Sequence, residues 1–224
     1  MRIRPSLSVL SLLALGVQLQ WGLHAVQAAT WIGDNNVWFT AEFPEQVLSS
    51  RPLSWADIDN GGLGSTDYST WGTASLKKGR KVTITVQSDD PNFHPGISVW
   101  YRPQGESLVD SNYAWSHFYR QTENIIGNDV LLEVTREPLG NIRMWFIRNA
   151  WDKDGAPAIA PENSDPSLKG VKDKVKGRVK LTFTPKQTGV HQFAIGGYDP
   201  GPDPLDPLIR YPLTVTIKGI PLSP

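Results

Sequence analysis

Cysteine is absent from all 224 residues of the chain, and methionine occurs only twice. Without cysteine there is no disulfide framework, so the fold of an exported chain must depend on an ordinary hydrophobic core. The formal net charge is zero as well, because 22 basic residues balance 22 acidic ones. Such a surface gives no electrostatic reason to expect nucleic acid or an anionic membrane as a partner.

Long apolar runs are scarce too, and the one candidate lies near the N-terminus. Residues 1–28 contain two arginines, a mostly apolar run over residues 7–17 and small residues at the end. This order is typical of a secretory signal peptide. Gln18 and Gln20 interrupt the run well before the roughly 20 apolar residues that a membrane span needs.

We expect signal peptide cleavage after Ala28, which leaves one domain, residues 29–224, in the periplasm or at the cell surface. Cleavage removes two arginines and no acids, so 20 basic residues face 22 acidic ones and the net charge becomes −2. This length is ample for one hydrophobic core. The domain keeps three histidines, which are His94, His117 and His191.

Alternation of apolar and polar residues dominates after residue 30 and predicts β-strands. In residues 81–86, KVTITV, the side chains of Val82, Ile84 and Val86 share one face. Related patterns occur in residues 37–43, 96–102, 142–148, 178–184, 190–197 and 212–218. Turn sequences rich in glycine and proline separate them. We therefore expect an all-β fold, an antiparallel β-sandwich of seven or more strands with long loops.

Three segments give more local expectations. Residues 178–184 and 190–197, joined by PKQTG at 185–189, are typical of a β-hairpin. Residues 123–137 are the one candidate for a helix, although a glycine and several β-branched residues disfavour it. The longest irregular region is 150–177, which is rich in Pro, Gly, Asp and Lys.

An unusual aromatic cluster surrounds one histidine. Residues 113–119, YAWSHFY, place four aromatic rings around His117. On the predicted strand 190–197, His191 alternates in step with Phe193 and Ile195, so it faces the interior if they do. A single histidine beside aromatic rings is usually a packed core residue that bonds a backbone carbonyl. Three such histidines, the only ones in the domain, favour a metal site modestly.

The composition restricts the kind of metal site. No thiolate is present, and only Met144 remains after the leader, which excludes blue-copper and other thiolate sites. A histidine-brace copper site is disfavoured, because the mature chain would begin at Ala29 or Thr30. A site of two or three imidazoles remains, and it suits Cu(I), Cu(II) or Zn(II).

The motif Trp115-x-His117, followed by His191 about seventy residues later in a cysteine-free exported β-protein, resembles the copper-repressible surface copper(I)-binding proteins of methane-oxidising bacteria, the MopE and CorA type. The resemblance implies Cu(I) held by His117 and His191, with Trp115 oxidised to kynurenine as a third ligand. It also implies copper acquisition or buffering without catalysis, and association with outer-membrane copper-uptake machinery.

Two alternative ion sites remain open. His94 and Trp100 form a rival histidine–tryptophan pair, and all three histidines could converge on one ion. The sequence DKDG at 152–155 offers Asp152 and Asp154 as candidate calcium ligands, although no closing glutamate follows at the spacing of a calcium loop.

Two further functions remain open as well. Three histidines and a water could form a zinc hydrolase or lyase site, with Glu106, Asp110 or Glu123 as the acid or base, although no catalytic motif is present. Exposed aromatic residues could instead form a carbohydrate-binding platform. Three tryptophans within predicted strands are expected in the core rather than on such a platform: Trp38, Trp100 and Trp145.

Overall fold

The computed structural model describes residues 36–55, 63–64, 69–103, 125–127, 142–154, 168–199, 201 and 208–222. For residues 125–127 and 142–143 it describes the backbone alone. The predicted signal peptide lies outside these residues, and so do the cluster 113–119 and the acids Glu106, Asp110 and Glu123. No helix among the described residues is long and apolar enough to cross a membrane.

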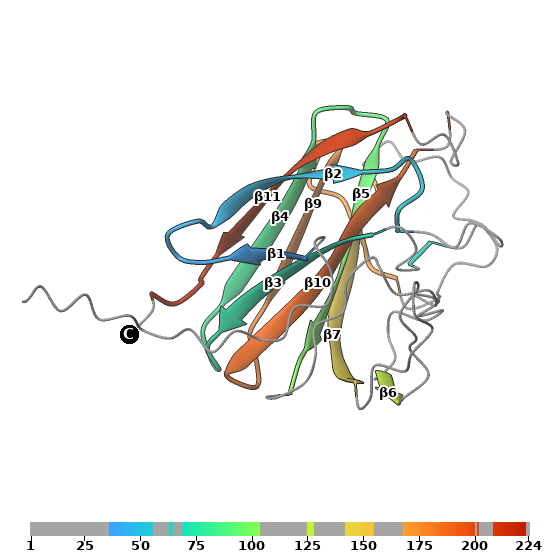
Figure 1. Cartoon of the computed structure of the whole chain (residues 1–224). Coiled ribbons are helices and arrows are strands. Elements are labelled where there is room, and N and C mark those ends of the chain that lie inside the picture. The colour runs from blue at the N-terminus through green and yellow to red at the C-terminus, as the bar shows by residue number, and fades with distance from the viewer. Residues whose placement is uncertain are drawn as a thin grey trace, which may run out of the picture.

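Two β-sheets form the described part of the chain (Figure 1). The four-stranded sheet has the order β2 (Glu45–Ser50), β11 (Tyr211–Lys218), β4 (Val82–Ser88) and β9 (Arg178–Phe183). The seven-stranded sheet has the order β1 (Asn36–Phe39), β3 (Thr70–Leu76), β10 (Gly189–Tyr198), β5 (His94–Tyr101), β7 (Ile142–Asp152) and β6 (Ile125–Gly127), and β8 (Gly170–Val171) pairs with β7. The predicted all-β sandwich is therefore confirmed.

Most neighbouring strands are antiparallel, as predicted. The exceptions are two short pairings, because β1 runs parallel to β3 and β8 runs parallel to β7. The segment 123–137, considered for a helix, instead contributes β6. The irregular region 150–177 contains the end of β7 and all of β8.

The core between the sheets follows from the alternation in the sequence. On β4, Val82, Ile84 and Val86 are fully buried, whereas Thr83 and Thr85 are only partly covered. The opposite sheet adds buried side chains from β5 and β10 to the same hydrophobic cluster, among them Ile97, Val99, Phe193 and Ile195. Each large aliphatic side chain buried in this way contributes about 1.5–3 kcal/mol.

The larger sheet is also buried on its other face. Trp71 and Trp100 lie on that face with no exposed surface, and their ring centroids are 5.7 Å apart. Gln192, on β10 between their two strands, is buried as well. Trp100 is therefore a core residue, as expected, and Trp38 is half-buried.

The predicted hairpin of residues 178–184 and 190–197 is wrong. The first segment forms β9, which pairs with β4, whereas the second forms β10 in the other sheet. Residues 185–189 cross between the sheets, and they bond the turn after β3 rather than close on themselves. Gly79 N–H donates to the Pro185 carbonyl oxygen, and Lys78 N–H donates to Thr188 Oγ1, both at 3.0 Å.

The expectation that Trp145 lies in the core is also wrong, because 38% of its surface is exposed. The pairing of β5 with β7 is irregular close to this residue. Val99 pairs with Arg148 and Trp100 pairs with Phe146, so that Ile147 has no opposite residue. Beyond this extra residue, Trp145 lies on the same side of the sheet as Tyr101, in the last pair that β5 and β7 form.

Candidate metal centre

His191 is fully buried on β10, in line with the alternation that also buries Phe193 and Ile195. Its Nδ1 lies 2.9 Å from the carbonyl oxygen of Gly189. A carbonyl oxygen accepts only, so Nδ1 carries the proton and Nε2 keeps its lone pair. Within the described part of the chain, Nε2 is buried and has no hydrogen-bond partner.

Two aromatic rings lie against the His191 imidazole. Tyr101, directly opposite on β5, makes an edge contact with ring centroids 5.3 Å apart. Phe183, from β9 in the other sheet, approaches with a centroid distance of 6.3 Å. The imidazole thus lies between the sheets, beside rings that limit its freedom to turn. Neither Tyr101 nor Phe183 was predicted as a site residue, because the register of Tyr101 with His191 depends on strand pairing, which alternation alone does not give.

Burial also determines the charge of His191. Desolvation lowers its pKa from 6.5 to about 4, against a smaller opposing effect of the hydrogen bond to Gly189. At neutral pH the imidazole is therefore uncharged. A neutral imidazole whose Nδ1–H is held by a backbone carbonyl, with a free Nε2, is the form in which histidine binds metal ions.

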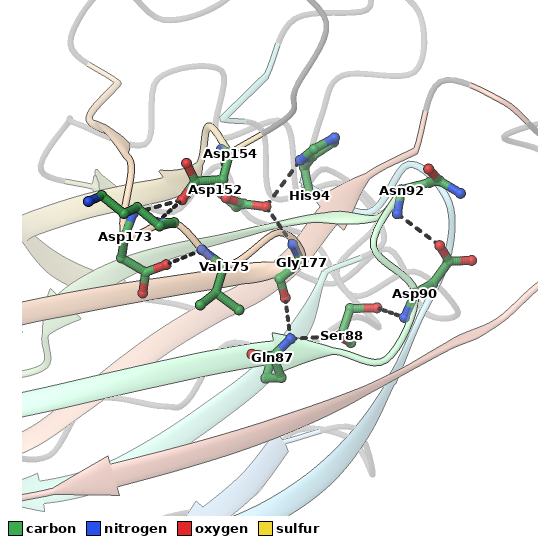
Figure 2. A network of polar contacts seen from close by, with 11 residues as sticks. Gln87, Ser88, Asp90, Asn92, His94, Asp152, Asp154, Asp173, Val175 and Gly177 are labelled. Carbon is green, nitrogen blue, oxygen red and sulfur yellow. Dashed lines mark hydrogen bonds and ion pairs between the residues drawn. The ribbon is translucent and has the colours of Figure 1, made fainter.

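His94 lies in a different environment, at the start of β5. Its Nδ1 is 3.1 Å from Oδ2 of Asp152, and both side chains are buried. Figure 2 shows this pair within a network that joins the end of β7 to the loop before β9. Gly177 N–H donates to the same carboxylate oxygen at 2.8 Å. His94 thus has the structural role that a buried, hydrogen-bonded histidine usually has.

The two described histidines lie at opposite ends of one strand pair. Tyr101 pairs with His191 and His94 pairs with Tyr198. The seven residue-to-residue steps along β5 from position 94 to position 101 span roughly 23 Å at about 3.3 Å per step. One ion cannot bind both imidazoles, which excludes convergence of all three histidines and with it the zinc enzyme site built on them.

The distance along strand β5 also excludes a metal site formed by His94 and Trp100. Six residues on one extended strand separate them by roughly 20 Å. Trp100 instead packs between Trp71 and Phe146, with centroid distances of 5.7 Å and 6.0 Å. Trp100 is therefore a packing residue in the second buried face of the larger sheet.

The candidate calcium ligands have other partners (Figure 2). Asp152 accepts from His94 and Gly177 through Oδ2, and from the Asp154 N–H through Oδ1. Oδ2 of Asp154 accepts from the backbone N–H groups of residues 173 and 174, each at 2.7 Å. These N–H groups occupy the lone pairs of the carboxylate oxygens and bring positive partial charge to the place that a cation would take. Searched over the described residues, no group of three or more His, Asp or Glu side chains could hold a metal ion.

Beside this network, Asp173 neutralises nearby positive charge. Burial alone would raise its pKa, but hydrogen bonds from Arg178 and from the Val175 N–H, together with the charges of Arg178 and Lys180, hold the pKa below its usual value. These contacts give Asp173 a structural role in the loop before β9.

Of the four predicted metal ligands, two lie outside the described residues. His117 and Trp115 belong to the cluster 113–119, so their distance from His191 stays a prediction. The structure separates His94 from His191, and Nε2 of His191 has no hydrogen-bond partner among the described residues. Among the described histidines, His191 therefore has the geometry of a metal ligand.

Comparison with known proteins points to the same chemistry. The family model described as copper(I)-binding protein, CorA-like, matches residues 27–204. The structure of CorA from Methylomicrobium album BG8, a surface-associated copper-binding protein important in copper acquisition, aligns with a TM-score of 0.68. Its sequence is 32% identical, and the alignment covers 83% of this chain and 98% of that chain.

A second solved structure shares the fold. Mercury-soaked MopE, a secreted protein of Methylococcus capsulatus in which an oxidised tryptophan facilitates copper binding, aligns with a TM-score of 0.52. Its sequence is 15% identical, over 84% of this chain and 87% of that chain. No curated protein sequence matches the chain.

Proposed function

Because the chain belongs to the CorA-like family of copper(I)-binding proteins, we propose that it is an exported protein that binds Cu(I) through His191, His117 and an oxidised Trp115, and that it acquires or buffers copper. The observation that carries the proposal is the buried Nε2 of His191, which has no partner in the described part of the chain. A buried polar atom without a partner is costly. A bound metal ion would satisfy it.

The donor set suits Cu(I). Two neutral imidazoles and one weak third ligand give a low-coordinate site, and a d¹⁰ ion has no ligand-field preference for more donors. Tyr101 and Phe183 cover the His191 ring, so water has little room to complete a larger coordination shell around an ion there. Cu(II), which prefers a tetragonal arrangement of nitrogen and oxygen ligands, would bind less well.

Oxidation would convert Trp115 into a ligand. Indole only donates through its N–H and has no lone pair to coordinate with. Cleavage of the C2–C3 bond of the indole by one O₂ gives N-formylkynurenine, and hydrolysis then releases formate and leaves an aromatic amine beside a ketone. Both new groups have lone pairs. The secreted neighbour MopE, in which an oxidised tryptophan facilitates copper binding, supports this step.

The proposed location rests on the leader and on the relatives. Residues 1–28 have the pattern of a signal peptide, and the two similar structures belong to a surface-associated and a secreted protein. We place residues 29–224 in the periplasm or at the cell surface as one copper-binding domain. We propose that the domain passes its copper ion to copper-uptake machinery of the outer membrane.

Mass spectrometry of protein from its native host, combined with elemental analysis, tests the modification and the metal together. The proposal expects stoichiometric copper and a kynurenine mass change on the peptide that contains Trp115. Unmodified Trp115 together with stoichiometric copper would remove the third ligand but keep the imidazoles. Zinc, or no metal at all, would overturn the proposed function.

Substitution of the ligands tests the site itself. His191→Ala and His117→Ala should each abolish tight Cu(I) binding, measured by competition with a colorimetric Cu(I) chelator. His94→Ala is the matched control, because it removes a buried imidazole roughly 23 Å away and should leave the Cu(I) affinity unchanged. Retention of affinity in both ligand variants would contradict the assignment.

A further inference from the structure

The side chains of His191, Tyr101 and Trp145 form a row of three rings across neighbouring strands of the larger sheet, and His191 is its buried end. His191 on β10 pairs with Tyr101 on β5, and Tyr101 pairs with Trp145 on β7. Figure 1 shows these three strands side by side. Residues directly opposite one another in neighbouring strands point to the same side of the sheet. The row therefore crosses three adjacent strands without a break.

The rings of this row touch in sequence. The Tyr101 centroid lies 5.3 Å from that of His191 and 5.6 Å from that of Trp145. Exposure rises along the row, because His191 has no exposed surface, Tyr101 is partly covered and Trp145 is 38% exposed. The row thus joins a buried imidazole to the protein surface over roughly 10 Å, two inter-strand spacings.

A buried Cu(I) site that receives copper as Cu(II) needs such a connection. This argument rests on the proposed function, in which His191 binds Cu(I). Copper outside an aerobic cell is mostly Cu(II), so one electron must reach each ion that is bound as Cu(I). No surface of the His191 imidazole is open to a reductant in solution. Electron tunnelling slows exponentially with the gap between donor and acceptor, and rings in contact shorten that gap.

We propose that the row Trp145–Tyr101–His191 is the path by which an electron enters and leaves the copper site. A soluble one-electron reductant that docks at Trp145 loses one electron, and Cu(II) at His191 gains it and becomes Cu(I). No bond breaks and no proton moves in this step. The rings act as a bridge and end the reaction unchanged.

The neighbouring residue on β7 provides a matched control. Phe146 also pairs with β5, but its ring lies 6.0 Å from Trp100 on the other buried face of the sheet. That contact leads to Trp71, at 5.7 Å from Trp100, and away from His191. Loss of the Phe146 ring should therefore leave electron transfer to the copper site unchanged.

The rate of electron transfer along the row can be measured as oxidation of bound Cu(I), because the same rings carry the electron in either direction. The full-length mature protein is loaded with Cu(I) and mixed in stopped flow with a water-soluble ferrocenium ion, which takes one electron without exchanging ligands. Trp145→Leu and Tyr101→Leu should each slow the oxidation at least about tenfold, equivalent to about 1.4 kcal/mol of activation free energy. Phe146→Leu should match the wild type.

Cu(I) occupancy, measured before each reaction, separates the path from the site. Equal rates in the wild type and Trp145→Leu at equal occupancy would overturn the path and leave the proposed function intact. Equal slowing in Phe146→Leu would overturn it as well, because the effect would not be specific to the row. If Tyr101→Leu does not bind Cu(I), the rate of Trp145→Leu alone decides, because Trp145 is partly exposed and its replacement disturbs the core less. Failure of the wild type to load Cu(I) contradicts the proposed function instead.

Discussion

The Nδ1 of His191 lies 2.9 Å from the carbonyl oxygen of Gly189, two residues earlier on the same strand. This contact fixes the tautomer in which Nδ1 carries the proton and Nε2 is the donor atom for a metal. The imidazole thus already has the tautomer that the proposed copper ligand needs. Little reorganisation has to accompany metal binding at this residue.

Removal of the unsatisfied nitrogen should stabilise the protein without metal. His191→Leu replaces a buried imidazole, whose Nε2 has no described partner, by an apolar side chain of similar volume beside Tyr101 and Phe183. We expect the metal-free variant to gain about 1 kcal/mol in free energy of unfolding, while tight Cu(I) binding is lost. Urea unfolding of both metal-free proteins measures the difference. A loss of stability in the variant would contradict the idea that Nε2 is unsatisfied.

The depressed pKa of His191 predicts a pH dependence of stability. The pKa is about 4 in the folded protein and near 6.5 when unfolded. Between these values only the unfolded state binds the proton, so stability falls as the pH drops from 6.5 to 4 and is unaffected above that window. The shift corresponds to up to about 3 kcal/mol, at about 1.4 kcal/mol per pKa unit.

Metal-free His191→Leu is the comparison that isolates this contribution. Both proteins are unfolded with urea at several pH values from 4 to 8. The stability difference between variant and wild type should grow in favour of the variant as the pH falls below 6.5. Parallel curves for the two proteins would show that His191 does not titrate as its burial requires.

Alternation in the sequence was sufficient for the fold class and for the inner face of the sandwich. It placed Val82, Ile84 and Val86 correctly, and it placed His191 inside with Phe193. It missed β2 and β3, because EQVLSS and TWGTASL are rich in small and polar residues and have weak strand propensity. Their burial comes from tertiary packing, which no local pattern contains.

Turn chemistry and strand register were harder to predict. PKQTG has the residues of a hairpin turn, yet it connects two sheets, because a turn sequence specifies a change of direction and not the partner of the next strand. Alternation also indicated neither the extra residue Ile147 in β7 nor the 38% exposure of Trp145. The family resemblance based on Trp115, His117 and His191 is confirmed, but the ligand set stays a prediction.

Asp152 should be a stability residue that is independent of copper. Its carboxylate accepts three N–H donors, including the imidazole of His94. Asp152→Ala should lower the free energy of unfolding by about 2–4 kcal/mol, because two buried donors and one partly buried donor lose their acceptor. It should leave Cu(I) affinity unchanged. The exposed Asp89→Ala is the control and should change neither quantity. Weaker Cu(I) binding in Asp152→Ala alone would connect the network to the metal site.

Calcium should not stabilise this network. The oxygens of Asp152 and Oδ2 of Asp154 already accept backbone or imidazole N–H groups, so they are unsuited to a cation. We expect the same melting temperature in excess calcium and in chelator. A rise with calcium that disappears in Asp152→Ala and persists in Asp89→Ala would restore the calcium site.

The carbonyl oxygen of Gly189 holds the imidazole of His191, the proposed metal ligand, so replacement of Gly189 should impair copper binding. Its φ is +140°, and an added Cβ would lie 3.3 Å from the Tyr101 ring. Gly189→Ala should cost about 1–3 kcal/mol of stability and weaken Cu(I) binding, because the carbonyl that orients His191 must move.

Gly79 provides the control, since its φ is +78° but an added Cβ meets nothing within 4 Å. Gly79→Ala should thus lose stability through backbone strain alone and keep the wild-type Cu(I) affinity. Equal Cu(I) affinity in the two variants, measured by chelator competition, would show that the Gly189 carbonyl does not position His191.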